Sequence, residues 1–253
     1  MRVFAGPNGS GKSTVINSVR SYKTEAGKID FGIYVNADDI NKDLRQGKFT
    51  FTQYKIKTTP IEFEQIALTS GLINKKFPLK VFKTCYVIKK HKILLKKEKY
   101  VEQLAQIIAD FLRKKLLDAN QKFSFETVFS HESKLDIMKQ ARDKGYKVYL
   151  YFVSTNSPEI NKERVALRVK KGGHYVPPDK IVSRYYRSLN HLFEAAQISY
   201  QTFFFDNSKD KPNMFTNFKI VNGKKNWAKI DEKEAPDWFI KYYANKVKGQ
   251  KSK

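Results

Sequence analysis

Directly after its first five residues, the chain carries the segment Gly6-Pro7-Asn8-Gly9-Ser10-Gly11-Lys12-Ser13, which Thr14 follows. The segment fits the pattern G-x-x-x-x-G-K-[ST] of a phosphate-binding loop. Glycines let the backbone wrap so closely that successive N–H groups point at phosphate oxygens, and the helix that the loop opens favours an anion at its N-terminus. In such a loop the lysine, Lys12, reaches the terminal phosphates, and the hydroxyl of Ser13 ligates Mg²⁺. We therefore predict that residues 6–14 bind ATP or GTP with Mg²⁺. The motif alone does not separate a kinase from a switch or a motor.

Short apolar strands alternate with amphipathic helices on both sides of this loop. The segment Val3-Phe4-Ala5 is a predicted strand, and residues 11–22 are predicted to be helical because their apolar side chains share one face. The same patterns predict strands at 33–35, 122–128, 147–153 and 202–206, helices at 100–117, 133–144, 157–170 and 179–196, and a late hairpin turn at Asn222-Gly223. This alternation predicts a P-loop NTPase of the α/β class. Helices would cover both faces of a mainly parallel sheet, as in nucleotide kinases.

The stretch from residue 42 to residue 99 interrupts the alternation. Thr59-Pro60 is typical of a helix start, and residues 79–95 are predicted to form a hairpin with strands at 81–88 and 93–95. We therefore predict a kinase-like core at 1–41 and 100–253, with a lid at about 157–180. A basic α+β insertion would occupy residues 42–99.

The chain is strongly basic, with 49 Lys or Arg against 25 Asp or Glu and a formal net charge of +24. Residues 42–122 hold 19 Lys or Arg against seven Asp or Glu, which leaves +12 on this segment. Such a field attracts polyanions, although a lysine-rich composition alone produces the same surplus. Aromatic residues lie between these lysines, as stacking on bases requires, but they would equally form the core of an insertion: Phe49, Phe51, Tyr54, Phe77, Phe82 and Tyr86.

Several classes of protein are disfavoured by the sequence. No apolar run approaches the ~20 residues of a membrane span. The first residues lack the basic region and apolar stretch of a secretory signal, and the single cysteine, Cys85, forms no internal disulfide. We expect a cytoplasmic protein without a membrane partner.

Three further segments carry a resemblance to a known family: Val35-Asn36-Ala37-Asp38-Asp39-Ile40, Phe123-Ser124-Phe125-Glu126-Thr127-Val128 and Gly172-Gly173-His174-Tyr175-Val176-Pro177. Together with the loop, in this order and spacing, they resemble the zeta-toxin family of P-loop kinases. The likeness is greater to the uncharacterised ATPase-like branch with a Gly-Gly-His segment than to the toxins proper. It extends from residue 2 to about residue 207, apart from the basic insertion.

The resemblance implies an activity and roles for particular residues. Zeta toxins are similar in fold to small-molecule kinases and phosphorylate the 3′-hydroxyl of a UDP-amino sugar. Asp38 would then be the base that accepts the proton of the acceptor hydroxyl, with Asp39 as its rival, and Glu126 and Thr127 would contact the acceptor. The alternative for the two aspartates is that one or both only cap the following helix. The alternative for Glu126 is that it pairs with a nearby lysine. The resemblance also implies a separate antitoxin chain as a partner.

Two arginines of the predicted lid are candidates for phosphate contacts. Arg164 and Arg168 are four residues apart and share a helix face. Arginine suits phosphate geometry, so these two would close over the triphosphate from a segment that ends in Gly172-Gly173. Because Glu159 and Glu163 lie on the same helix, a solvated charged face is the alternative. His174 stands where the toxins carry a second lid cation, and imidazole is only partly charged at neutral pH.

Three functions remain open at this stage. The first is a kinase that transfers the γ-phosphoryl group of ATP to a hydroxyl of a small acceptor, such as a UDP-amino sugar, with Asp38 as base. The second is a polynucleotide kinase or another nucleic-acid-binding protein that grips the backbone through residues 42–122. The third is a slow NTPase switch without an acceptor. An essential acceptor base separates the first two from the third.

Overall fold

The computed structural model describes residues 1–25, 27–228 and 234–251. The chain divides into a larger unit, residues 1–31 and 126–253, and a smaller unit, residues 32–125. The predicted insertion at 42–99 lies inside the smaller unit, together with segments 32–41 and 100–125 that the sequence pattern assigned to the core. The predicted domain limits at 41 and 99 remain a prediction.

Five of the seven strands of the main sheet lie wholly in the larger unit, in the order β11-β10-β9-β8-β1. Strand β1 runs parallel to β8, with Phe4 beside Tyr151, and β8 runs parallel to β9. Strands β10 and β11 continue the sheet in antiparallel fashion through the predicted turn at Asn222-Gly223. Both turn residues have positive φ, 49° and 74°, as a two-residue hairpin turn requires. The bounds are β1 Arg2–Ala5, β8 Tyr149–Ser154, β9 Gln201–Asp206, β10 Asn213–Val221 and β11 Lys224–Trp227.

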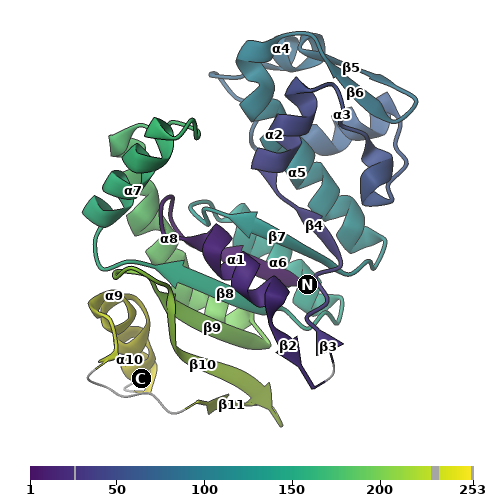
Figure 1. Cartoon of the computed structure of the whole chain (residues 1–253). Helices are drawn as coiled ribbons and strands as arrows, with labels where there is room; N and C mark the ends of the chain where they lie inside the picture. The colour runs from purple at the N-terminus through teal and green to yellow at the C-terminus, as the bar shows by residue number, and fades with distance from the viewer. Residues whose placement is uncertain (26, 229–233, 252–253) are drawn as a thin grey trace. The chain divides into compact units, whose positions relative to one another are not determined.

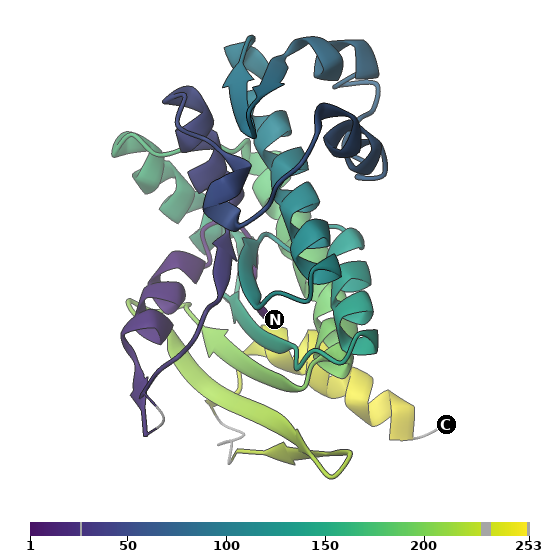
Figure 2. The ribbon, with the colours of Figure 1, turned by 90° about the vertical axis from the view of Figure 1, so that its right-hand side faces the viewer.

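Helices of the larger unit cover both faces of its strands. Figures 1 and 2 show α1 on one face and α6 and α8 on the other. Helix α8 packs against β8 and against α6 and α7, so its apolar face is buried along its length. The remaining elements are a small ribbon near the N-terminus and a group at the C-terminus. The bounds are α1 Lys12–Ser21, β2 Lys23–Thr24, β3 Gly27–Lys28, α6 Ser133–Asp143, α7 Pro158–Lys170, α8 Pro178–Ile198, α9 Asp237–Phe239, η4 Ile240–Ala244 and α10 Asn245–Lys251.

The smaller unit is built around the long helix α5, whose apolar side chains are buried as its periodicity predicts. Helix α2 packs against it. Strand β4 runs parallel to the first part of β7, with Val35 beside Phe125. The bounds are β4 Ile33–Val35, α2 Ala37–Arg45, η1 Phe51–Tyr54, α3 Pro60–Leu68, α4 Leu79–Thr84, β5 Tyr86–Lys89, β6 Lys92–Leu95, η2 Glu98–Tyr100, α5 Val101–Asp118 and β7 Phe123–Thr127. The predicted α/β class with a mainly parallel sheet is therefore confirmed.

The predicted hairpin at 79–95 is correct only in its second half. The β5–β6 ribbon begins at Tyr86, and residues 79–84 form helix α4 instead of a strand. Pro78 immediately precedes the helix, and the helical turn places Phe82 in the core of the unit, where it is fully buried. Burial of this one large side chain outweighs the strand preference of Val81.

The aromatic residues of the basic segment form a core. Phe63 is fully buried and lies in ring contact with four neighbours at centroid distances of 5.1–6.0 Å: Phe51, Phe82, Tyr86 and Phe111. Of the six aromatics between the lysines, only Tyr86 is not buried to below a tenth of its surface. The hydrophobic-core alternative therefore holds for these residues, and they offer no stacking platform for bases.

The smaller unit should lose stability selectively when this core is opened. Phe63→Ala should lower its free energy of unfolding by about 3–5 kcal/mol. The matched control is Ile61→Ala on the same helix, where the side chain is 70% exposed and the change should stay within about 0.5 kcal/mol. Cys85 is the reporter, because burial raises the pKa of its thiol to about 11 and makes it unreactive in the folded unit. Thiol labelling at increasing urea should therefore shift to lower urea for Phe63→Ala alone, and an equal shift for both variants would contradict this account.

Candidate functional site

The phosphate-binding loop joins the end of β1 to the start of α1 and lies very close to its neighbours. Gly6 has φ 146°, and a Cβ there would lie 2.0 Å from the carbonyl oxygen of Val153 on β8. Gly11, the residue before α1, has φ 90°, and a Cβ there would lie 2.1 Å from Nδ2 of Asn207. Both positions therefore demand glycine for space and for backbone conformation.

Two buried asparagines bind carbonyl oxygens of the loop. Asn161, in the first turns of α7, donates from Nδ2 to the carbonyl of Asn8 at 2.6 Å. Asn207, directly after β9, donates from Nδ2 to the carbonyl of Ser10 at 2.8 Å. Because a trans peptide directs its C=O and its N–H in opposite directions, the N–H groups of the next residues point away from the asparagines. The pair thus turns alternate loop amides to the side on which a phosphate would lie.

A further network fixes Asn161 itself. The hydroxyl of Thr155 donates to Oδ1 of Asn161, and the carbonyl of Thr155 accepts from the hydroxyl of Tyr185 at 2.6 Å. Burial raises the pKa of Tyr185, so the phenol keeps its proton and remains a donor. Arg184 adds a longer contact, 3.4 Å, from NH1 to Oδ1 of Asn8. The end of β8 and helices α7 and α8 therefore converge on the loop.

Lys12 lies at the start of α1 with only 6% of its surface exposed. Its Nζ donates to the carbonyl of Pro7 at 3.0 Å and lies 3.7 Å from Oε1 of Glu126. A buried ammonium is stable only with such partners, since its desolvation is costly. Glu126 thus pairs with Lys12 of the loop, and its contact with an acceptor stays a prediction.

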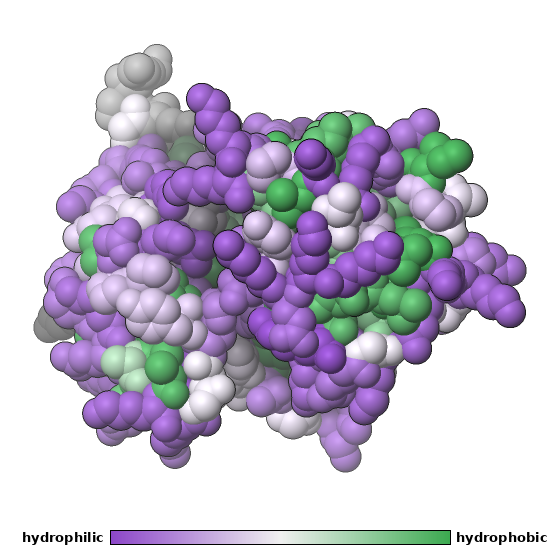
Figure 3. Space-filling view, turned by 90° about the horizontal axis from the view of Figure 1, so that it is seen from above, coloured by the Kyte–Doolittle hydropathy of each residue, from purple (hydrophilic) through white to green (hydrophobic). Residues whose placement is uncertain are grey.

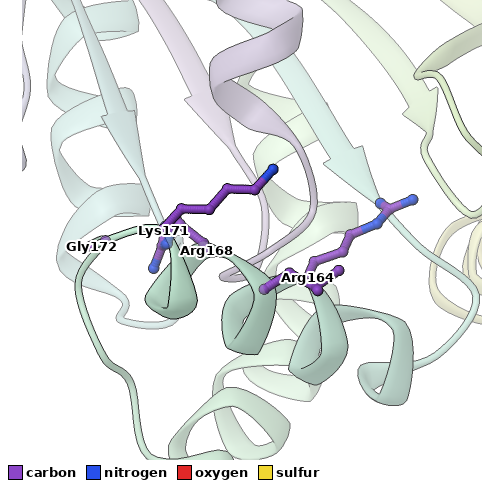
Figure 4. Close-up of a pocket in the computed structure, with 6 residues that line it drawn as sticks. Arg164, Arg168, Lys171 and Gly172 are labelled. Carbon is purple, nitrogen blue, oxygen red and sulfur yellow. The ribbon is translucent and has the colours of Figure 1, made fainter.

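Helix α7 brings Arg164 and Arg168 to one pocket of about 440 Å³. No acidic residue lines this pocket, which is formed by Arg164, Leu167, Arg168, Lys171, Gly172 and Gly173. Figure 4 shows the Arg168 side chain turned toward Gly172, whereas Lys171 and Arg164 extend away from it. Three cations on one short segment make the pocket suitable for an anion.

The two arginines differ in how they are held. Arg164 donates from NH1 to the carbonyl of Asn207 at 2.6 Å and from NH2 to that of Lys209 at 2.7 Å. Arg168 makes one such contact, from NH2 to the carbonyl of His174 at 3.1 Å. Arg164 is therefore fixed to the segment after β9, while Arg168 contacts only the segment that follows its own helix.

The Gly-Gly segment ends α7 in a Schellman motif. The N–H of Gly172 donates to the carbonyl of Val169 and that of Gly173 to the carbonyl of Arg168, each at 2.9 Å. A small apolar cluster of Val165, Val176 and Ile181, with Val169 against it, joins the segment after the cap to both helices. The predicted lid at 157–180 thus comprises α7, the capped turn that follows it and the first residues of α8.

The other predicted residues occupy different settings. Asp38 and Asp39 lie exposed in the first turn of α2, in the smaller unit. Asn36 is the cap of that helix, since its Oδ1 accepts from the N–H of Asp38 at 2.8 Å. Asp38 therefore does not cap the helix itself, and its role as base remains a prediction. Thr127 uses its hydroxyl to accept from the N–H of Phe129 at 3.0 Å, which supports a turn next to Glu126.

The residues around the loop are suited to a nucleotide with Mg²⁺. Ser13, the predicted Mg²⁺ ligand, is an exposed residue on the first turn of α1. Across the described residues, no group of three or more His, Cys, Asp or Glu is arranged to hold a metal ion. Mg²⁺ does not need such a cage, because it binds through one or two protein oxygens together with phosphate oxygens and water.

Comparison with known proteins shows which family the chain resembles. The zeta toxin family model matches residues 91–211, a segment that contains Glu126, Thr127, Arg164 and Arg168. The chain is therefore an α/β protein with a phosphate-binding loop. Over residues 91–211 it is similar to the zeta toxin family, and this segment contains two of the motifs that carry the resemblance, at 123–128 and 172–177. An uncharacterised protein of Haemophilus influenzae is 38% identical over 63 residues, which is 25% of this chain and 45% of that protein.

Solved structures show the same fold. A chain of the AvrRxo1-ORF1:AvrRxo1-ORF2 complex with sulphate ions gives a TM-score of 0.52 at 14% identity, with 89% of this chain and 59% of that chain covered. The same complex with ATP gives 0.51 at 13% identity, with 95% and 62% covered. This chain thus spans less than two thirds of these relatives. Within the described residues, no helix is both long enough and apolar enough to cross a membrane.

The sequence analysis missed Asn161 and Asn207. Asn207 follows a predicted strand directly, at the carboxyl end where ligands of parallel sheets bind, so its position offered a signal. Asn161 had none, since an asparagine in a first helical turn is ordinary.

Asn161 should be worth more to stability than an ordinary helical asparagine. Asn161→Ala removes the donor to the Asn8 carbonyl and the acceptor of the Thr155 hydroxyl, and it should lower the free energy of unfolding by about 1–3 kcal/mol. Asn190→Ala, at an exposed position of α8, is the control and should change little. Fluorescence during urea unfolding reports on the larger unit, because Trp227 and Trp238 are the chain's two tryptophans and both lie there. Equal unfolding midpoints for the two variants would show that Asn161 does not secure the loop.

Proposed function

We propose that this chain is an ATP-dependent phosphotransferase of the zeta toxin type, which phosphorylates a hydroxyl of a small acceptor. The observation that carries the proposal is the loop of residues 6–13. Two of its carbonyls are held by Asn161 and Asn207, and the buried ammonium of Lys12 donates to a third, that of Pro7. A glycine turn that binds nothing has no need of a buried lysine or of two dedicated asparagines.

The loop residues fit a triphosphate. Positions 6 and 11 admit no side chain, and the amides after Asn8 and Ser10 face away from the asparagines, so the backbone can approach phosphate oxygens closely. ATP with Mg²⁺ supplies the transferable γ-phosphoryl group when bound, with Ser13 as the protein ligand of the metal. Lys12 neutralises negative charge at the terminal phosphates, and the electropositive pocket of Arg164 and Arg168 adds to it from α7.

Glu126 has two roles in this proposal. In the absence of nucleotide it partly neutralises Lys12, at 3.7 Å. With Thr127 it would also hold the acceptor by accepting hydrogen bonds from hydroxyl groups. The turn that Thr127 supports at Phe129 also keeps the Glu126 backbone in place.

Asp38 is the proposed general base. A carboxylate in hydrogen-bond reach of the acceptor hydroxyl takes its proton as the oxygen attacks phosphorus, which commonly contributes 10²–10⁴ in rate. The acceptor follows from the resemblance to zeta toxins, and a UDP-amino sugar is the first candidate. An inhibitory second chain belongs to the same proposal, since the related AvrRxo1 structures contain two different chains.

Phosphoryl transfer from γ-labelled ATP to a panel of acceptors tests the proposal. The panel contains UDP-amino sugars, nucleosides, and 5′-hydroxyl DNA and RNA. Lys12→Ala should abolish labelling, and Asp38→Asn should lower kcat by about 10²–10⁴ with a smaller change in KM. Asp179→Asn is the matched control, because Asp179 is also an exposed acidic residue in a first helical turn, at α8, and should leave the rate unchanged.

Each alternative has its own outcome. If Asp39→Asn, but not Asp38→Asn, loses activity, the base is Asp39. Label in a polynucleotide would move the acceptor to nucleic acid. Slow release of free phosphate that is insensitive to both aspartate variants would overturn the kinase assignment in favour of a switch.

A further inference from the structure

The turn of the β5–β6 ribbon carries several positive charges, whose mutual repulsion lowers the stability of the ribbon. Lys89 and Lys92 lie directly opposite each other across the two strands, and like charges in that position repel. Lys90 and His91 form the turn between them with φ of 46° and 64°. That conformation favours Asn and Gly, so both residues are strained relative to the usual choice. Local rules that are broken together in this way are expected at functional sites.

The turn is held in place by the segment that precedes α3. The carbonyl of His91 accepts from the N–H of Phe51 at 2.9 Å and from the hydroxyl of Thr50 at 3.1 Å. Thr50 also forms an isolated bridge with Lys92. The ring of His91 lies against the backbone of Thr58, with Nδ1 3.2 Å from its nitrogen, which brings the neighbouring Lys57 to the same region. The lysines therefore project from a fixed base.

Acidic residues do not compensate this charge. Residues 75–99 contain ten lysines and a single acidic residue, Glu98, which pairs with Arg45 at 4.0 Å. Lys57, Lys89, Lys90 and Lys92 are exposed, and none makes an ion pair with another described residue. Figure 3 shows long hydrophilic side chains on this face, with apolar patches between them.

We propose that this basic turn, defined as Lys57, Lys89, Lys90 and Lys92, binds the phosphate backbone of double-stranded nucleic acid. Fixed cations on a rigid ribbon suit a regular array of phosphates, and a two-stranded ribbon has the width of a duplex groove. The inference goes beyond the proposed phosphotransfer and does not depend on it.

Two observations select a duplex over other polyanions. Binding of single strands relies on aromatic side chains that stack on bases, and five of the six aromatics between the lysines of this segment are buried in the core. Binding to a membrane surface combines charge with apolar side chains that enter the lipid. The largest exposed apolar side chains of the smaller unit, Ile61, Leu68 and Leu79, lie on α3 and α4 and not on the turn.

The test measures binding of the full chain to a labelled 20-base-pair duplex by fluorescence anisotropy, without ATP, between 50 and 200 mM salt. The variant Lys89→Gln/Lys90→Gln/Lys92→Gln should bind at least about tenfold more weakly at the lower salt concentration. Because each lost phosphate contact removes about 0.9 from the slope of log affinity against log salt, its slope should be smaller by about 2.7. The control Lys180→Gln/Lys224→Gln/Lys246→Gln removes the same charge from exposed positions of the larger unit and should change the affinity less than threefold.

Three results would overturn the proposal. Equal losses in the two triple variants would assign binding to the overall charge of the chain. Tighter binding to a single strand than to the duplex would contradict the absence of a stacking platform. Binding to phosphatidylglycerol vesicles that depends on the three lysines, with duplex binding that does not, would assign the turn to a lipid surface. Lys12→Ala should bind the duplex as the unchanged chain does, so failure of the kinase proposal would leave this result intact.

Discussion

The close approach of the phosphate-binding loop to the end of β8 is the constraint from which the larger unit can be understood. With the carbonyl of Val153 occupying the space of a Gly6 side chain, the loop has no room to relax, and its own carbonyls must find partners in a buried place. Asn161 and Asn207 supply them from α7 and from the end of β9. The loop thus ties together a strand, a helix start and a segment that are far apart in sequence, and its shape is set before any ligand is present.

The same burial explains the surroundings of Lys12. An ammonium with 6% of its surface exposed loses most of its hydration, and the chain offsets this with the carbonyl of Pro7 and the carboxylate of Glu126. These partners hold the ammonium beside the loop, where the proposed function requires a cation to meet the phosphates.

The sequence predicted those features that depend on residues close together along the chain. The loop motif, the alternation of strands and helices, and the Asn222-Gly223 turn each depend on residues within a few positions, and all three are present. The sequence pattern did not predict helix α4, because Val81 and its neighbours favour a strand when taken alone. The burial of Phe82 that favours the helix depends on Phe63 and Phe77. The contacts of Asn161 and Asn207 with the loop could not be predicted. Their partners are backbone carbonyls 153 and 197 positions away, and residue types do not tell where a distant backbone group lies.

The contacts of α7 also limit what a lid can be. Its N-terminal half is tied to the loop through Asn161 and to the segment after β9 through both nitrogens of Arg164, so movement of that half would break three hydrogen bonds and expose a buried asparagine. From Arg168 onward the contacts include the Schellman cap, the bond to the His174 carbonyl and the packing of Val176 against Val165 and Ile181. Of the two predicted lid arginines, Arg164 is therefore bound to the segment after β9. Closure over a triphosphate stays a prediction, and it would depend on Arg168 and Lys171 of the same pocket.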